Sequence, residues 1–95
     1  YPKEIESYLD ALPGVLESAV VGIPDRDFGE AVAAVIVPAP GTTLEPAETI
    51  AALKARIAGF KVPRQVRIVR ELPRNQMGKV QKTLLRTSFE TASRS

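Results

Sequence analysis

Two apolar runs decide the fold: AVVGI at residues 19–23 and AVAAVIV at residues 31–37. Both are short and rich in β-branched residues, which is typical of strands that are buried on both faces of a sheet. Turn-forming residues separate and end them, with PDRD at 24–27 and PAPG at 38–41. Because only about seven residues join the two runs, we expect the strands to pair antiparallel.

Helices are predicted before and after this strand pair in the sequence, because apolar residues recur there every three or four positions. The three helical segments are residues 2–12, 44–58 and 82–91. We expect Thr43 to cap the second helix and Gly59 to end it. The apolar positions are Ile5, Tyr8, Leu9 and Leu12 in the first helix, Ala47, Ile50, Leu53 and Ile57 in the second, and Leu85 and Phe89 in the third.

A third strand is predicted after Pro63, where Val66 and Ile68 alternate with Arg67. The element order is then αββαβα. That order predicts a small α+β domain, a three-stranded sheet flanked by helices. The 95 residues suit one domain over 1–95, and we expect the tail at 91–95 to fray.

The composition excludes several classes of function. The chain has no Cys and no His, so it offers no thiolate, no Ser–His pair and no metal site built on sulfur or imidazole. Thirteen basic and eleven acidic residues give a net charge of +2, too small and too mixed to require nucleic acid. We find no apolar stretch that could span a membrane and no secretory leader, and the missing initiator Met suggests a piece of a longer chain. We therefore expect a cytoplasmic protein without a metal site of its own.

The loop at residues 73–82 has the strongest signal for chemistry. It brings Arg74, Lys79 and Lys82 close together around Gly78, where the absence of a side chain permits a sharp turn or a close approach. A lysine ammonium on such a loop suits a phosphate or a developing negative charge. The alternative is a solvated basic turn, with Lys82 and Arg86 on the exposed face of the following helix.

Residues 72–82, LPRNQMGKVQK, closely resemble the C-terminal signature of the adenylate-forming enzymes: acyl-CoA synthetases, peptide-synthetase adenylation domains and luciferases. The usual pattern is Pro-Arg/Lys-Thr-x-x-Gly-Lys-Ile/Val-x-Arg/Lys. This chain has Asn75 in place of the common Thr and Met77 in place of Ser or Ala. Further matches lie at 2–6 (PKEIE), 19–25 (AVVGIPD), 28–30 (FGE) and 60–64 (FKVPR), so the resemblance covers essentially the whole chain.

The resemblance implies a two-step reaction. A carboxylate attacks the α-phosphate of ATP to give an acyl-adenylate, and the thiol of CoA then displaces AMP. The family's large N-terminal domain binds ATP, Mg²⁺ and the acyl group, and the small C-terminal domain is its lid. The large N-terminal domain is therefore the expected partner of the present chain. Without it, the chain is expected to be inactive. Lys79 falls on the adenylation lysine, whose charge bridges the α-phosphate and the attacking oxygen.

The resemblance also suggests residues that bind CoA. An aromatic side chain at Phe28 and another at Phe60 would lie near the CoA nucleotide, and Arg64 would contact its phosphates. Phe28 as cover for the sheet edge and Phe60 as a core residue are the competing interpretations. Gly78 and Lys82 are expected to support the loop, whereas Glu6 is expected to be a solvated or capping group.

The resemblance also suggests an acyl substrate. The amino-acid sequence of the loop is most similar to that of malonyl-CoA and related dicarboxylate CoA ligases. Alternatives are the lid of a carrier-protein adenylation domain or of a luciferase-like enzyme, and a nonenzymatic interaction module.

Overall fold

The computed structural model describes residues 2–27 and 29–94, with the backbone alone for residues 60 and 92–94. The elements are, in order, α1 (Pro2–Asp10), β1 (Val15–Asp25), β2 (Gly29–Pro38), α2 (Pro46–Lys54), the short 3₁₀ helix η1 (Gly59–Lys61), β3 (Gln65–Ile68) and α3 (Lys82–Arg94). The predicted α+β class and the order αββαβα are confirmed, with η1 as an addition.

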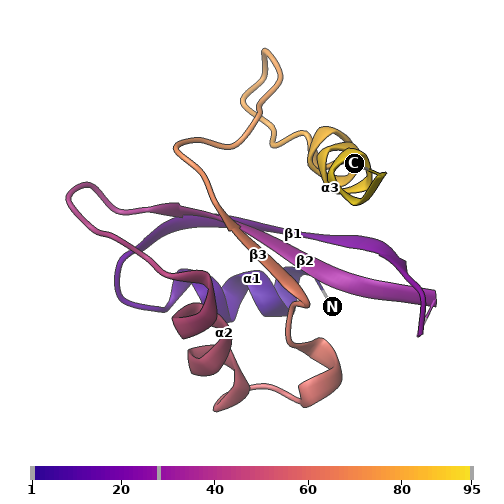
Figure 1. Ribbon diagram of the computed structural model, residues 1–95. Coiled ribbons are helices and arrows are strands. Elements are labelled where there is room, and N and C mark those ends of the chain that lie inside the picture. The colour runs from indigo at the N-terminus through magenta and orange to yellow at the C-terminus, as the bar shows by residue number, and fades with distance from the viewer. Residues whose placement is uncertain (1, 28, 95) are drawn as a thin grey trace.

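The sheet is mixed, with strand order β1-β2-β3. β1 and β2 form the predicted antiparallel pair, which starts at Asp25 opposite Gly29, whereas β3 runs parallel to β2. A parallel neighbour requires a long crossover, and the segment that contains α2 and η1 provides it. Figure 1 shows the result as three layers, with α1 and α2 on one face of the sheet and α3 on the other.

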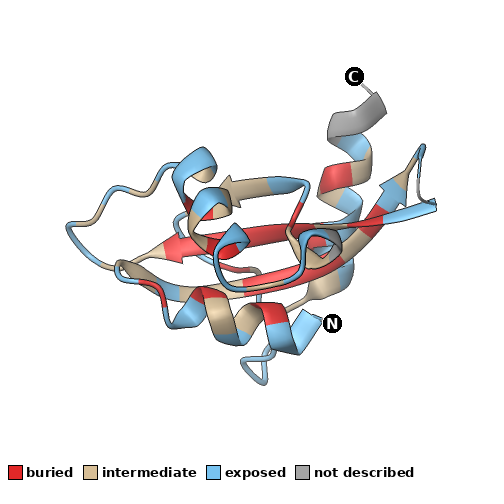
Figure 2. Ribbon diagram, turned by 90° about the horizontal axis from the view of Figure 1, so that it is seen from below, coloured by how far each residue is buried: buried red, intermediate tan, exposed pale blue. Residues whose placement is uncertain are grey.

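The core consists of two apolar clusters, one on each face of the sheet. Val21, Ala33 and Val35 face Leu85 and Phe89 of α3. The alternate residues of the same strands face the other way, where they form the second cluster with Ile5, Leu9, Leu12 and Leu53. Since successive side chains of a strand point to opposite faces, both parities must be apolar. The unbroken runs at 19–23 and 31–37 follow from this, and buried residues fill the middle of the sheet in Figure 2.

β1 is an edge strand, and side chains cover its free backbone groups. The Val20 N–H donates to the Glu6 carboxylate at 2.7 Å, and the Gly22 carbonyl accepts from Arg86 Nε at 3.3 Å. Pro24 follows with the same two-residue spacing, and a proline has no N–H to leave unpaired. The strand therefore continues through Pro24 to Asp25, and the prediction of a turn that begins at Pro24 is wrong.

The second helix is shorter than predicted. It begins at Pro46, with Glu45 at the N-cap position and no side-chain cap, so the prediction that Thr43 caps it is wrong. Proline suits the first helical position because its fixed φ and missing N–H cost nothing there. The helix ends at Lys54, well before Gly59, and Ala47 is exposed. In contrast, α3 continues to Arg94, three residues beyond the predicted end.

Candidate functional site

The loop between β3 and α3 is a small hairpin whose base is fixed in the core. Leu72 is buried and Val80 packs against the cluster beneath α3. Arg74 and Val80 form an antiparallel bridge, and the Gln81 N–H donates to the Pro73 carbonyl at 2.8 Å. These contacts hold the two arms of the hairpin side by side, and the tip between the arms projects from the domain (Figure 1).

Asn75 closes the tip of this hairpin. Its Oδ1 accepts from the backbone N–H of Met77 at 2.9 Å and from that of Lys79 at 3.0 Å. The Asn75 N–H donates to the Lys79 carbonyl, and the Gly78 N–H donates to the Asn75 carbonyl, both at 3.0 Å. Gly78 has a φ of 83°, a left-handed conformation that glycine adopts without strain. Residues 75–79 are therefore a closed turn with a defined backbone.

Arg74 ties the hairpin to the sheet. Its Nη1 donates to the Gly78 carbonyl at 2.8 Å, and its Nη2 contacts the Glu17 carboxylate on β1. One guanidinium thus links the turn at Gly78 with the edge strand. This geometry places Arg74 as a support of the loop.

Lys79 is exposed at the end of this turn. Because Val80 points into the core, Lys79 points outward, as expected for neighbours in an extended segment. Its ammonium forms no ion pair with the residues that the structure describes. The arrangement combines a fixed backbone with an available positive charge.

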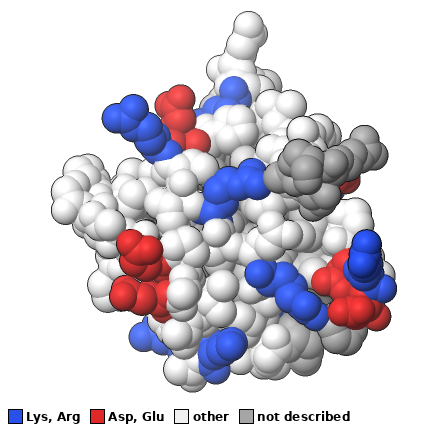
Figure 3. Space-filling view, in the orientation of Figure 1, with Lys and Arg blue, Asp and Glu red and all other residues white. Residues whose placement is uncertain are grey.

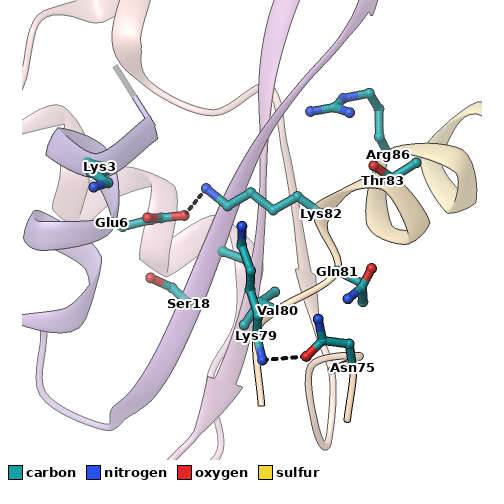
Figure 4. Close-up of a pocket in the computed structure, with 11 residues that line it drawn as sticks. Lys3, Glu6, Ser18, Asn75, Lys79, Val80, Gln81, Lys82, Thr83 and Arg86 are labelled. Atoms are coloured by element: carbon teal, nitrogen blue, oxygen red, sulfur yellow. Dashed lines mark hydrogen bonds and ion pairs between the residues drawn. The ribbon is translucent and has the colours of Figure 1, made fainter. Parts of the chain in front are cut away.

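The Lys79 side chain borders a groove along the free edge of β1. The groove has a volume of about 770 Å³, and its walls are α1, the hairpin and the first turns of α3. Figure 4 shows the charged side chains around this space. The lining residues are Lys3, Glu6, Ser18, Ala19, Asn75, Lys79, Val80, Gln81, Lys82, Thr83 and Arg86.

Lys82 closes one side of this groove by pairing with Glu6. Lys82 Nζ lies 2.8 Å from Glu6 Oε2, the oxygen that also accepts from the Val20 N–H. The Glu6 side chain is only 19% exposed. The prediction that Glu6 is a solvated or capping group is therefore wrong: its carboxylate joins α1, β1 and the start of α3. Within the sequence, the nearest basic residue to Glu6 on the same helix is Lys3, three positions earlier. This local spacing does not indicate a partner 76 residues further along the chain.

Arg64, which is predicted to bind CoA, belongs to another part of the molecule. Arg64 lies beside the β1–β2 hairpin, with its Nε 3.9 Å from Asp25 Oδ2, and its backbone N–H donates to the Val32 carbonyl at 2.8 Å. Phe28 and the side chain of Phe60 lie outside the described residues. Asp25 lies seven positions after Ser18 along the extended strand β1, so it is about 23 Å from this end of the groove.

Two further features of the described residues bear on function. They contain no group of three or more His, Cys, Asp or Glu side chains that could hold a metal ion. In the same residues, no helix has both the length and the apolar character needed to cross a bilayer.

Comparison with known proteins identifies the family. Residues 4–79 match the family model described as the AMP-binding enzyme C-terminal domain. The chain belongs to this family. The family resemblance inferred from residues 72–82 is therefore confirmed.

Two of the curated relatives of this AMP-binding C-terminal domain are named as a CoA ligase and a CoA synthase. A 3-(7a-methyl-1,5-dioxo-octahydro-1H-inden-4-yl)propanoyl:CoA ligase of Rhodococcus jostii is 52% identical over 86 residues, which are 90% of this chain and 17% of the relative. A feruloyl-CoA synthase of an Amycolatopsis species is 43% identical, over 94% of this chain and 18% of the relative. The chain thus spans about a sixth of the length of these relatives.

Solved structures agree with this assignment. The ATP-bound MatB of Rhodopseudomonas palustris superimposes with a TM-score of 0.89 and 53% identity, over 94% of this chain and 18% of that one. A fatty acyl-CoA synthetase of Mycobacterium tuberculosis gives a TM-score of 0.85 and 38% identity, over 97% and 18%. Both the fold and the sequence of the C-terminal domain are therefore shared with enzymes about five times as long.

Proposed function

We propose that the chain is the C-terminal lid of an ATP-dependent, AMP-forming acyl-CoA ligase, and that Lys79 is its catalytic residue. The single observation that carries this proposal is the Lys79 ammonium. It stands without an ion pair, among the described residues, at the end of a turn whose backbone is fixed by Asn75. A cation for phosphoryl chemistry needs to be both accessible and accurately placed.

In the first step a carboxylate oxygen attacks the α-phosphorus of ATP. The new bond forms between that oxygen and phosphorus, and the bond to the β-phosphate oxygen breaks, so that pyrophosphate leaves. Lys79 would lie between the attacking oxygen and the α-phosphate, where negative charge shifts during the transfer. In the second step the CoA thiol attacks the acyl carbon of the adenylate, and AMP leaves.

The partner of the lid is the large N-terminal domain of the same enzyme, which would hold ATP, the carboxylate and Mg²⁺. Between the two steps the lid would rotate and withdraw Lys79. The separation of about 23 Å between the groove and Asp25 suits this, because two different regions of the lid can face the reactants in turn.

For the second step we propose that Phe28, Phe60 and Arg64 receive the CoA nucleotide. Arg64 would contact a phosphate group, and the two aromatic rings would lie near adenine. Gly78 and Lys82 support the adenylation loop, Gly78 through its left-handed turn and Lys82 through its pairing with Glu6.

The substrate we propose is malonate or a related dicarboxylate. Two observations support this choice. One is the amino-acid sequence of residues 72–82, and the other is the presence of MatB, a malonyl-CoA synthetase, among the structural neighbours. Acyl selectivity resides in the large domain, and relatives of similar identity bear names with indenyl-propanoyl and feruloyl substrates. We place the enzyme in the cytoplasm.

A different thiol or amine acceptor is the second candidate. A fatty acid–acyl-carrier-protein ligase of Streptomyces coeruleorubidus is 42% identical, and the amide bond synthetase McbA of Marinactinospora thermotolerans is 39% identical. Adding CoA, carrier protein or amine separately to the full-length enzyme and measuring AMP release distinguishes these acceptors.

The central experiment separates the two half-reactions in the full-length enzyme. Lys79→Ala should reduce ATP–pyrophosphate exchange about 100-fold or more, since one stabilising group for the transition state is lost. Thioester formation from preformed acyl-adenylate should be unchanged. Lys54→Ala, which removes an exposed lysine at the end of α2, is the matched control. Equal loss of both half-reactions would contradict the assignment of Lys79.

A further inference from the structure

Most of the charged side chains that line the groove beside Lys79 are basic. Four cationic side chains line it, Lys3, Lys79, Lys82 and Arg86, together with the carboxylate of Glu6. The lining therefore has three more positive than negative charges, more than the +2 of the whole chain. On the face shown in Figure 3, by contrast, acidic and basic side chains are interspersed.

The four cations differ in the ion pairs and hydrogen bonds that they already form within the protein. Lys82 is paired with Glu6, and Arg86 donates through Nε to the Gly22 carbonyl. Lys3 and Lys79 form no ion pair with any described residue. A concave surface with charge of one sign focuses its electrostatic potential, so the groove attracts anions.

The cations come from opposite walls. Lys3 lies on α1, whereas Lys82 and Arg86 lie one turn apart on α3, and the edge of β1 lies between the two helices. The Glu6–Lys82 pair links these walls and keeps them in register. An anion with several charged groups offers more contacts to cations on the two walls than an anion with one.

We propose that this groove binds a terminal polyphosphate, either free pyrophosphate or the β- and γ-phosphates of a nucleoside triphosphate. Lys3 and Lys79 supply the uncompensated charge, and Lys82 and Arg86 supply further donors from α3. No bond forms or breaks in the groove. None of the described residues that line the groove is aromatic, and they therefore offer no stacking surface of the kind that binds single-stranded nucleic acid.

The biological source of the ligand rests on the proposed function. Adenylation releases pyrophosphate next to the α-phosphate that Lys79 contacts, and the groove adjoins Lys79. The groove would then bind the departing pyrophosphate while the lid opens. Binding of pyrophosphate to the chain itself can nevertheless be measured without any turnover, so the two proposals fail separately.

The test titrates the 95-residue chain with inorganic pyrophosphate and follows backbone amides by NMR at low ionic strength. We expect saturable shifts confined to α1, Ser18, Ala19 and residues 79–86. Lys3→Gln and Arg86→Gln should each weaken binding about tenfold, the effect of losing one charge-assisted contact. Lys3 forms no ion pair with the described residues, so we expect its variant to keep the fold. Lys54→Gln, outside the groove, is the control and should bind as the parent does.

Further ligands distinguish the two sources. ATP that binds like pyrophosphate assigns the groove to the nucleotide tail as well, whereas pyrophosphate bound much more tightly than ATP assigns it to the released product. Orthophosphate and AMP should bind at least tenfold more weakly than pyrophosphate, because each bridges fewer cations. The proposal is overturned if pyrophosphate causes no saturable shifts, if Lys54→Gln weakens binding as much as Lys3→Gln, or if CoA or an acidic peptide binds as tightly as pyrophosphate.

Discussion

The hairpin between β3 and α3 and the turn at the end of the β1–β2 pair differ in how their cations are paired. At the hairpin the backbone of residues 75–79 is closed by hydrogen bonds, while the ammonium of Lys79 has no ion pair among the described residues. At the other end Arg64 faces Asp25 at 3.9 Å and is already held by other parts of the protein. One charge is available and the other is partnered.

The difference fits the two tasks proposed for them. A group that must stabilise a transition state gains most when it is oriented in advance but not neutralised. A group that only binds a phosphate can keep a protein partner, because the carboxylate orients it and exchange with ligand remains possible. We therefore expect variants of Lys79 and of Arg64 to affect different half-reactions.

The largest effect is expected from removal of the Lys79 charge without removal of its chain. Stoichiometric acetylation of Lys79 should lower acyl-adenylate formation about 100-fold or more, because the amide carries no charge. Pyrophosphate release by the full-length enzyme measures this effect. Enzyme acetylated at Lys54 is the control, and turnover that survives complete acetylation of Lys79 would refute the assigned role.

Much of this contrast could be predicted from the sequence. The strands at 19–23 and 31–37, their antiparallel pairing and the position of Lys79 on a basic loop all follow from short-range patterns. The role of Asn75 had a local signal as well, since an Asn that precedes a turn with glycine often accepts from the backbone two residues on.

Other features depend on contacts between distant residues. Glu6 meets Lys82 only because α1 and α3 approach the same edge of β1, and no pattern within α1 specifies that approach. The continuation of β1 through Pro24 likewise depends on β1 being an edge strand. The false N-cap at Thr43 shows the opposite problem, because a favourable local residue was outweighed by Pro46 at the first helical position.

A smaller effect is expected when the hairpin loses its internal acceptor. Asn75→Ala leaves the N–H groups of Met77 and Lys79 without Oδ1, so the Lys79 backbone becomes mobile. Adenylation should fall about tenfold through this loss of orientation. Thioester formation from supplied adenylate should not change. Asn75→Ser retains a shorter acceptor and should recover part of the rate, whereas a rate equal to that of Asn75→Ala would indicate that the hydrogen bonds are unimportant.

A still smaller effect is expected at the opposite end of the sheet. Arg64→Gln should raise the CoA concentration needed for half-maximal thioester formation about fivefold, since one phosphate contact of several is lost. ATP–pyrophosphate exchange should be unaffected. Arg26→Gln removes a nearby exposed charge in the β1–β2 turn and is the matched control. A parallel loss of exchange activity in Arg64→Gln would mean that Arg64 serves the fold.

The smallest effect concerns the pair that joins the base of the hairpin to α1. Lys82 Nζ and Glu6 Oε2 are 2.8 Å apart, with side chains 36% and 19% exposed, so solvent weakens their attraction. Glu6→Gln retains an oxygen that can accept from the Val20 N–H, and its main cost is therefore the lost charge pair. We expect a coupling free energy of about 0.5 kcal/mol between Glu6→Gln and Lys82→Met in a double-mutant cycle followed by urea unfolding. The coupling should vanish at about 1 M salt, where charges are screened over about 3 Å. Additive effects at low salt would show that the pair contributes nothing to stability, and that the walls of the groove are held together by packing alone.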